Sequence, residues 1–283
     1  MVGVEVNVGE AVSAVVLAWN SSRYLRPTLT ALLKQREEVP TEIIVVDNGS
    51  TDGSPDIVRE VAPDAYVIRN ERNLGVARAR NQGLRVASGK YILLLDSDTE
   101  MTTGSLGQMK RFLDANPRFG IVGPKLIYSG GSVQFSCRRF PTVPGKLFRQ
   151  LPFQVRKAIS LVVEEELQNI DHSVAQPVDY VIGACQLIRR ATLDQIGLLD
   201  ERMFYAPEDV DLCLRAWQAG WEVYYLPSSV VVHGEQRLWR RRPGALTLKQ
   251  VVGLMYYFWK HHYLWRRPNP RSAFFREGRG GGA

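Results

Sequence analysis

Short apolar runs alternate with longer amphipathic segments through the first hundred residues of the chain. Continuous apolar runs of this length predict strands buried on both faces of a parallel sheet, and the amphipathic segments predict helices that cover it. Strands that alternate with helices in this way predict a Rossmann-like α/β fold with right-handed crossovers. The expected strands are 14–18, 42–46, 66–68 and 91–95, and the expected helices include 25–35 and 75–87.

The pattern continues less regularly after residue 100. Residues 142–177 are interpreted as an insertion or lid near an acceptor, with an amphipathic helix over 153–168 in which Glu164, Glu165 and Glu166 form a solvated face. The other expected elements are helices over 104–116, 212–219 and 246–265 and strands over 121–126, 178–189, 222–226 and 229–232.

These elements predict one large α/β domain with an appendage. We expect the domain to cover 1–238, with a nucleotide-binding half over 1–100 and an acceptor-side half over 101–238. A basic, aromatic helical extension follows over 239–283, and we expect its glycine-rich tail to be disordered.

Composition favours a cytoplasmic protein. The chain contains no run of eighteen apolar residues, and its start lacks a basic segment followed by an apolar one, so we expect neither a membrane span nor an export signal. Cys137, Cys185 and Cys213 are far apart and odd in number, which suits a reducing compartment rather than a disulfide framework or a metal site.

The net charge of +7 is unevenly distributed. Clusters of arginine beside tryptophan lie at 239–242 and 265–267, near the C-terminus. Such clusters suit an anionic partner, which composition alone leaves open among nucleic acid, a phospholipid surface and a phosphorylated substrate.

Polar side chains follow the predicted strands where each one ends. Asn20 follows the first strand, Asp47 the second, and Asp96-Ser97-Asp98 the strand at 91–95. Because the carboxyl ends of parallel strands meet at one edge of the sheet, we expect these residues to line a nucleotide crevice. Two carboxylates one residue apart suit Mg²⁺ or Mn²⁺, although a lone Asp-x-Asp also suits a turn and helix cap.

A second acidic group precedes the helix expected at 212–219. Glu208, Asp209 and Asp211 either cap that helix or present a general base at the mouth of the sheet. Gly183-Ala184, inside a predicted strand, either permits close approach of a ligand or relieves packing. The chain has no G-x-G-x-x-G after its first strand and no P-loop motif, which argues against a dinucleotide oxidoreductase and a P-loop NTPase.

Read together and in order, these motifs resemble those of the inverting family-two glycosyltransferases of GT-A fold. The resemblance covers roughly residues 11 to 235 and includes a segment, GACQLIRRATLDQIGLLDERMF at 183–204, similar to the rhamnosyltransferase-like branch. Its other motifs are AWN at 18–20, VVDNGSTDGS at 45–54, NLGVARARNQG at 73–83, LLLDSDTE at 93–100 and YAPEDVDLCLRAWQAGW at 205–221.

The resemblance implies a GT-A, mainly parallel sheet flanked by helices, and a metal-dependent transfer of a sugar from a nucleotide donor. Asp209 is the implied general base, Asp98 with Asp96 and His233 the implied metal ligands, and Gly183, Ala184 and Glu208 the acceptor side. The residues implied to bind the nucleotide sugar, a dTDP- or UDP-sugar, are Ala18, Asn20, Asp47, Asn73, Gly75, Arg78, Asn81, Asp96 and Ser97. Trp19 and Ala206-Pro207 depart from the family pattern, and these departures bear on which nucleobase the site selects and on which donor sugar it takes.

The aromatic segment 246–265 bears on the acceptor. Flanked by arginines, it suits an interfacial helix on the inner face of an anionic membrane, where a polyprenyl-diphosphate-linked sugar would be the acceptor. It equally suits a helix packed on the catalytic domain or on the partner of a homodimer.

Two other classes of function compete with transfer. A sugar nucleotidyltransferase would need a glycine-rich, arginine-containing loop after the first strand, where this chain has Trp19-Asn20-Ser21-Ser22. A non-catalytic anion-binding protein would leave the Asp-x-Asp and Glu-Asp pairs unexplained. We therefore expect a glycosyltransferase of cell-surface polysaccharide synthesis with no nucleic-acid partner.

Overall fold

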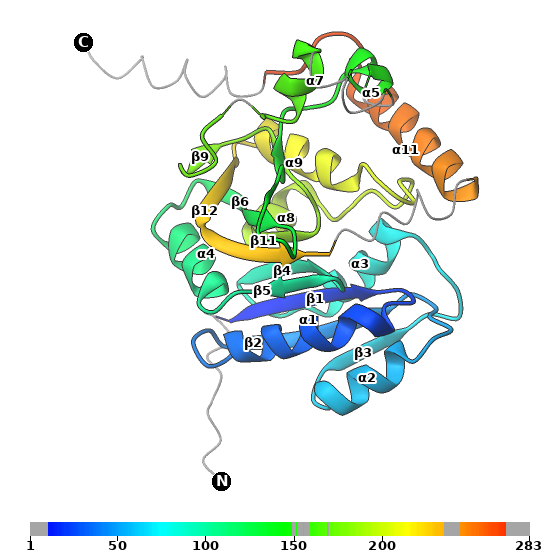
Figure 1. Ribbon diagram of the computed structural model, residues 1–283, viewed down its shortest axis with the longest axis vertical. Helices are drawn as coiled ribbons and strands as arrows, with labels where there is room; N and C mark the ends of the chain where they lie inside the picture. The colour runs from blue at the N-terminus through cyan, green and yellow to red at the C-terminus, as the bar shows by residue number, and fades with distance from the viewer. Residues whose placement is uncertain are drawn as a thin grey trace.

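The computed structural model describes residues 11–148, 151, 155, 159–168, 170–234 and 244–269 (Figure 1). Its centre is a mixed, mostly parallel sheet with the strand order β3-β2-β1-β4-β11-β6-β12-β5. The strands are β1 (Val12–Ala18), β2 (Thr41–Asp47), β3 (Tyr66–Arg69), β4 (Tyr91–Asp96), β5 (Thr99–Met101), β6 (Phe119–Ile127), β7 (Val133–Gln134), β8 (Cys137–Arg138), β9 (Gln176–Pro177), β10 (Tyr180–Val181), β11 (Cys185–Arg189) and β12 (Glu222–His233).

Helices cover both faces of this sheet (Figure 1). Alternate residues of β1 belong to two separate cores: Val12, Ala14 and Val16 pack with α1, α2 and α4, and Val15 packs with α3 on the other side. Burial on both faces explains why the strands are continuously apolar. The helices are α1 (Ser22–Gln35), α2 (Ser54–Val61), α3 (Val76–Val86), α4 (Ser105–Asp114), α5 (Val143–Phe148), α7 (Ser160–Glu165), α8 (Arg190–Ile196), α9 (Glu208–Gln218) and α11 (Ala245–His261).

The N-terminal half follows the predicted alternation. Strands β1 to β4 are all parallel, and β1 lies between β2 and β4, so the ends of β1, β2 and β4 meet at one edge. The parallel order breaks at β11, which runs antiparallel to both β4 and β6. Residues that follow β4 and β12 and residues that precede β11 are thereby brought to the same region of the molecule.

Several expectations for the second half were wrong. The strands expected at 222–226 and 229–232 are one strand, β12, with an irregularity in its pairing to β6 between Leu226 and Val230. The strand expected over 178–189 is two strands that belong to different sheets: β10 pairs with β8, whereas β11 pairs with β4 and β6, and a turn at 183–184 separates them. The helix expected at 212–219 begins at Glu208, and the short strand β5 and helix α5 were not foreseen.

The expected insertion contains a buried acidic pair rather than a solvated face. Within the part of 153–168 that the structure describes, Val155 is helical and the helix α7 covers Ser160–Glu165. Glu165 and Glu166 are buried while Glu164 is exposed, because Glu165 forms an ion pair of 2.8 Å with Lys146 of α5. The glycine-rich tail at 278–282 and the arginine cluster at 239–242 lie outside the described residues.

One face of α11 packs on the α/β domain, which is one of the three arrangements that the sequence left open. Tyr257 and Phe258 are buried in the same core as α9. Lys260 contacts Asp200 at 2.9 Å and Asp211 at 2.6 Å, and His261 contacts Asp211 at 2.8 Å. In Figure 1, α11 lies on the outside of the molecule beside α9. Among the described residues, no helix has the length and apolar character needed to cross a bilayer.

All three cysteines are free thiols inside the fold. Cys137, Cys185 and Cys213 are each 0–1% exposed. Burial raises the pKa of all three thiols, that of Cys137 to about 12.

Candidate active site

A cavity of about 280 Å³ opens where β1, β4 and β12 end and α3 and α9 begin. It brings together many of the residues selected from the sequence: Asn73, Gly75, Asp96, Ser97, Asp98, Gly183, Ala184, Glu208, Asp209 and His233. Residues that we did not select also line it: Leu17, Trp19, Ser21, Asn48, Val76, Arg80, Ile182, Phe204, Tyr205, Ala206 and Leu246.

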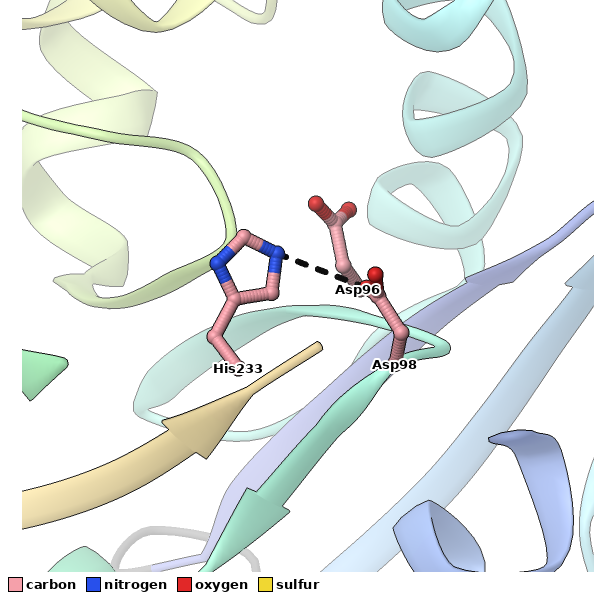
Figure 2. Close-up of side chains that lie close together, drawn as sticks. All are labelled: Asp96, Asp98 and His233. Atoms are coloured by element: carbon pink, nitrogen blue, oxygen red, sulfur yellow. Dashed lines mark ion pairs between the residues drawn. The ribbon is translucent and has the colours of Figure 1, made fainter. Parts of the chain in front are cut away.

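Asp96, Asp98 and His233 converge on one side of this cavity (Figure 2). One ligand atom from each residue lies within 4.8 Å of the others. His233 ends β12, where it pairs with Thr99, the residue that follows Asp98. The pairing of β12 with β5 therefore brings the histidine next to Asp98, which is 135 residues away in sequence.

The surroundings of His233 fix the orientation of its ring. Its Nδ1 lies 2.7 Å from Gln134 Oε1, so Nδ1 donates a hydrogen bond to that oxygen. The lone pair of the neutral ring then resides on Nε2, which lies 3.5 Å from Asp98 Oδ1. A histidine held in this way by a neighbouring acceptor is typical of metal ligands, and two carboxylates with one imidazole suit Mn²⁺ or Mg²⁺. The donor set thus fits the divalent cation expected from the sequence.

Arg80 connects this metal-ligand group to the opposite wall. The guanidinium is 2% exposed, and its Nη2 lies 2.6 Å from Asp96 Oδ1 and donates to the Gly183 carbonyl at 2.7 Å. Its Nη1 lies 3.4 Å from Glu208 Oε1. A buried charge needs such partners, because an unpaired one would carry a large desolvation penalty.

Glu208 and Asp209 stand in different environments although they are adjacent. Burial, followed by the charge of Asp209, raises the pKa of Glu208 to about 7. Asp209 accepts hydrogen bonds from the backbone N–H groups of Gly183 at 2.9 Å and Val210 at 2.8 Å. These bonds fix the orientation of the Asp209 carboxylate at the cavity wall.

Gly183 permits a close approach, as its position in the sequence suggested. The groups that approach it in the structure are the side chains of Arg80 and Asp209. A Cβ at this position would lie 2.7 Å from Arg80 Nη1 and 3.4 Å from the Asp209 Cβ. The missing side chain therefore lets Arg80 and Asp209 both approach the backbone of this one residue, Arg80 at its carbonyl and Asp209 at its N–H.

The loop before α3 forms the far end of the cavity. Asn73 Oδ1 accepts hydrogen bonds from Asn48 Nδ2 at 3.1 Å and from the Gly75 N–H at 2.8 Å. Gly75 has φ of +91°, and a Cβ there would lie 2.7 Å from the Phe204 carbonyl oxygen, so the turn requires glycine. The loop is thereby tied to residue 204, which precedes α9.

The structure places five other selected residues outside the cavity lining. Ala18 is buried at the end of β1, and Arg78 is exposed on α3. Asn20 Oδ1 accepts from the Thr51 N–H at 2.8 Å, and the buried Asp47 Oδ1 accepts from the Ser50 N–H at 3.0 Å. Asn81 forms two hydrogen bonds with the backbone of Leu199. These polar residues hold the loops around the cavity in place.

Helical periodicity would have distinguished Arg80 from Arg78. The buried positions of α3 include Ala77, Arg80, Asn81 and Leu84, a stripe with helical spacing. Arg78 lies outside that stripe. A basic residue on the apolar face of a helix needs buried partners, and Asp96 and Glu208 are those partners.

Residues 13–163, more than half of the chain, match the family model for glycosyl transferase family 2. The chain therefore belongs to this family, and it is a glycosyltransferase. Among its curated relatives is the N-acetylglucosaminyl-diphospho-decaprenol L-rhamnosyltransferase of Mycobacterium tuberculosis (strain ATCC 25618 / H37Rv), which is 29% identical over 252 residues, 84% of this chain and 81% of the relative.

Solved structures confirm the GT-A fold. The mannosyltransferase PcManGT from Pyrobaculum calidifontis, in complex with GDP-Man and Mn²⁺, matches 93% of this chain and 67% of its own with a TM-score of 0.61 and 19% identity. TarS 1–349 of S. aureus matches 79% of this chain with a TM-score of 0.55 and 21% identity, and the match spans 60% of that structure.

Proposed function

We propose that this glycosyltransferase is metal-dependent and inverting, and that it moves a sugar from a nucleotide donor to a lipid-linked or glycan acceptor in cell-surface polysaccharide synthesis. The observation that carries the proposal is that Asp96, Asp98 and His233 form a group in the same cavity that Asp209 lines. One side suits a diphosphate and its cation, and the other presents a carboxylate to an incoming hydroxyl.

The donor and acceptor are proposed from the relative in M. tuberculosis. Its name specifies L-rhamnose transfer to a sugar on a polyprenyl diphosphate, and its similarity extends over most of both chains. We therefore take dTDP-rhamnose as the first donor to test and a polyprenyl-diphosphate-linked sugar as the first acceptor. Trp19, Asn48 and Asn73 would surround the nucleoside end of the donor. The direct contact of Asp47 with the nucleoside stays a prediction.

Asp98, Asp96 and His233 would hold the cation, which would supply Lewis-acid stabilisation of the diphosphate charge. Asp209 accepts the proton of the acceptor hydroxyl as that oxygen bonds to the anomeric carbon. The bond between the anomeric carbon and the donor phosphate oxygen breaks, and its electron pair leaves with the nucleoside diphosphate. One displacement of this kind inverts the anomeric configuration.

Arg80 and the backbone of Gly183 position the groups on both sides of that reaction. Arg80 holds Asp96 while the Gly183 N–H holds Asp209, and both interactions involve the same peptide segment. The ion pair of Glu208 with Arg80, at 3.4 Å, supports Asp209 rather than Glu208 as the base, and the acceptor-side place of Glu208 stays a prediction.

The test is to separate donor binding from transfer with Asp209→Asn. We expect the variant to keep metal-dependent thermal stabilisation by the preferred nucleotide sugar, screened as dTDP-, UDP- and GDP-sugars with and without Mn²⁺ or Mg²⁺. Transfer should fall by about 10²–10⁴, the range for loss of a general base. Loss of nucleotide binding would instead assign Asp209 to the donor site, and wild-type protein that binds none of these nucleotides would contradict the proposal.

A further inference from the structure

The outward face of α11 is apolar although the helix is amply anchored on its other side. Its exposed residues recur at helical spacing, which places them in one stripe along the helix. Leu248 is 65% exposed, and Met255 and Trp259 are each 67% exposed. The docking face, as we call it, consists of Leu248, Val251, Val252, Met255 and Trp259.

The inward face explains why the helix keeps this orientation. Gly253, Tyr257 and Phe258 are buried, and Lys260 and His261 form ion pairs with Asp211 of α9. Apolar contact and ion pairs together fix the rotation of α11 about its axis. The packing of the inward face therefore keeps the docking face exposed to solvent.

The charge of the sequence that contains the docking face indicates the kind of partner. Between Gln236 and Arg276 the sequence has ten Lys or Arg residues and no Asp or Glu. Since the whole chain carries +7, the remainder carries −3, so the positive charge is concentrated on the segment that contains the docking face. A second copy would bring two such segments together with mutual repulsion, whereas an anionic bilayer is complementary to them.

We infer that the docking face binds the surface of an anionic lipid bilayer, with α11 lying in the interfacial plane. The stripe from Leu248 to Trp259 is about 16 Å long at 1.5 Å per residue. An apolar stripe with cationic flanks and tryptophan is the usual composition of a helix in that position. Trp265, 69% exposed, and the exposed Arg266 follow directly after the helix.

The inference deepens the proposed function and rests on it in one respect, the location of the acceptor. Leu246, in the first turn of α11, lines the cavity, and Lys249 Nζ lies 3.5 Å from the ring centroid of Phe204, another lining residue. Docking of α11 therefore places the cavity at the level of the lipid headgroups. That is where the diphosphate of a membrane-bound acceptor is found.

Vesicle co-sedimentation tests the inference with full-length protein. The vesicles are phosphatidylcholine alone or mixed with phosphatidylglycerol, and the variant is Met255→Glu with Trp259→Glu. The charge-matched control is Tyr66→Glu with Val67→Glu, which replaces two exposed apolar residues, 58% and 44% exposed. They belong to β3, the edge strand of the sheet, which lies at the other end of the molecule from α11 (Figure 1).

We expect wild type and control to bind the mixed vesicles alike and far better than phosphatidylcholine alone. The α11 variant should bind at least about tenfold more weakly, because it loses apolar contact and adds repulsion. Met255→Ser with Trp259→Ser should weaken binding in the same direction without a change in charge. Absence of wild-type binding, or equal loss in the β3 control, would overturn the inference.

Two further measurements separate the alternatives. Sedimentation equilibrium without lipid tests for a second copy, and a dimer that the α11 substitutions dissociate would overturn the bilayer assignment. Transfer to a water-soluble, short-chain acceptor should be unchanged in the α11 variants. If the vesicle results hold while no sugar is transferred by any form of the protein, docking stands and the proposed function fails.

Discussion

The wall of the cavity that carries Asp96 and Asp98 is positioned differently from the wall that carries Asp209. Asp96 ends β4, which is paired along its length with β1 and β11, and His233 ends β12, which is paired with β5 and β6. Asp209 lies in the first turn of α9, which is tied to α11 through Asp211, Lys260 and His261.

The difference is between backbone ladders and side-chain ion pairs. A ladder of backbone hydrogen bonds is insensitive to the identity of most side chains along it, whereas an ion pair is lost with one substitution or one proton. Changes far from the cavity should therefore reach the Asp209 wall more readily than the Asp98 wall. Arg80 is the exception, since its side chain contacts Asp96 in one wall and Glu208 in the other.

Asp98→Asn should have the largest effect on activity because, under the proposed function, it removes a charged ligand of the cation from the wall that carries Asp96 and Asp98. We expect transfer to fall by at least about 10³, equivalent to several kcal/mol of transition-state stabilisation. Metal-dependent nucleotide binding should weaken as well, while the thermal midpoint without metal stays close to that of wild type. Glu100→Gln, which removes an exposed carboxylate two residues away, is the matched control and should keep its activity.

Arg80→Met should disturb both walls at once. Loss of the guanidinium leaves Glu208 buried beside Asp209 without a cation, and breaking a buried pair by removing one partner costs about 3–5 kcal/mol. Urea unfolding measures this loss, and metal titration should show weaker binding because Asp96 is no longer held. The same change at Arg78, on the exposed side of α3, should leave both quantities nearly unchanged; equal destabilisation by the two would show that Arg80 does not link the walls.

Acid should weaken the ion pairs that Asp211 forms next to the wall that carries Asp209. The expected loss of stability is smaller than that for Arg80→Met. Burial alone would raise the pKa of Asp211, but His261, Arg215 and Lys260 outweigh it and lower the pKa from 3.8 to about 2. A carboxyl with a lowered folded-state pKa stabilises the protein above its unfolded pKa, and this stabilisation is lost as the pH falls through the folded-state value. The full contribution is about 2 kcal/mol, of which about 1 kcal/mol is lost between pH 6 and pH 3.

Asp211→Asn should remove this part of the pH dependence. Comparing the free energy of unfolding at about pH 6 and pH 3 measures it in wild type and variant. Asp194→Asn, which changes an exposed carboxyl on α8, should retain the wild-type dependence. A pH dependence that is identical in all three proteins would show that the ion pairs of Asp211 contribute nothing to stability.

The same contrast explains how much of the molecule the sequence could predict. Apolar runs predicted β1, β2 and β4, and the residues that follow a strand end are fixed by that strand, so Asp96 and Asp98 could be placed. His233 could be proposed only through the family resemblance, because its approach to Asp98 depends on the pairing of β12 with β5.

The wall that carries Asp209 was harder to predict from the sequence, because contacts between side chains far apart in the chain determine it. Tyr205 and Leu246 line the cavity through the packing of α9 and α11, which no local pattern specifies. Asn81 was selected from its motif, but its amide contacts Leu199 outside the cavity lining. The burial of Arg80 was the one missed feature that helical spacing alone could have revealed.

The burial of the three thiols has a practical consequence for studying α11, the helix that packs against α9. Because Cys137, Cys185 and Cys213 are all buried with raised pKa values, none offers an accessible thiolate to an alkylating reagent. A cysteine introduced on the outward side of α11, for example by Met255→Cys, would be the one accessible thiol in a chain that keeps all its native residues elsewhere. A fluorophore or spin label attached there would report the polarity around α11 with and without vesicles, against no background from the native cysteines.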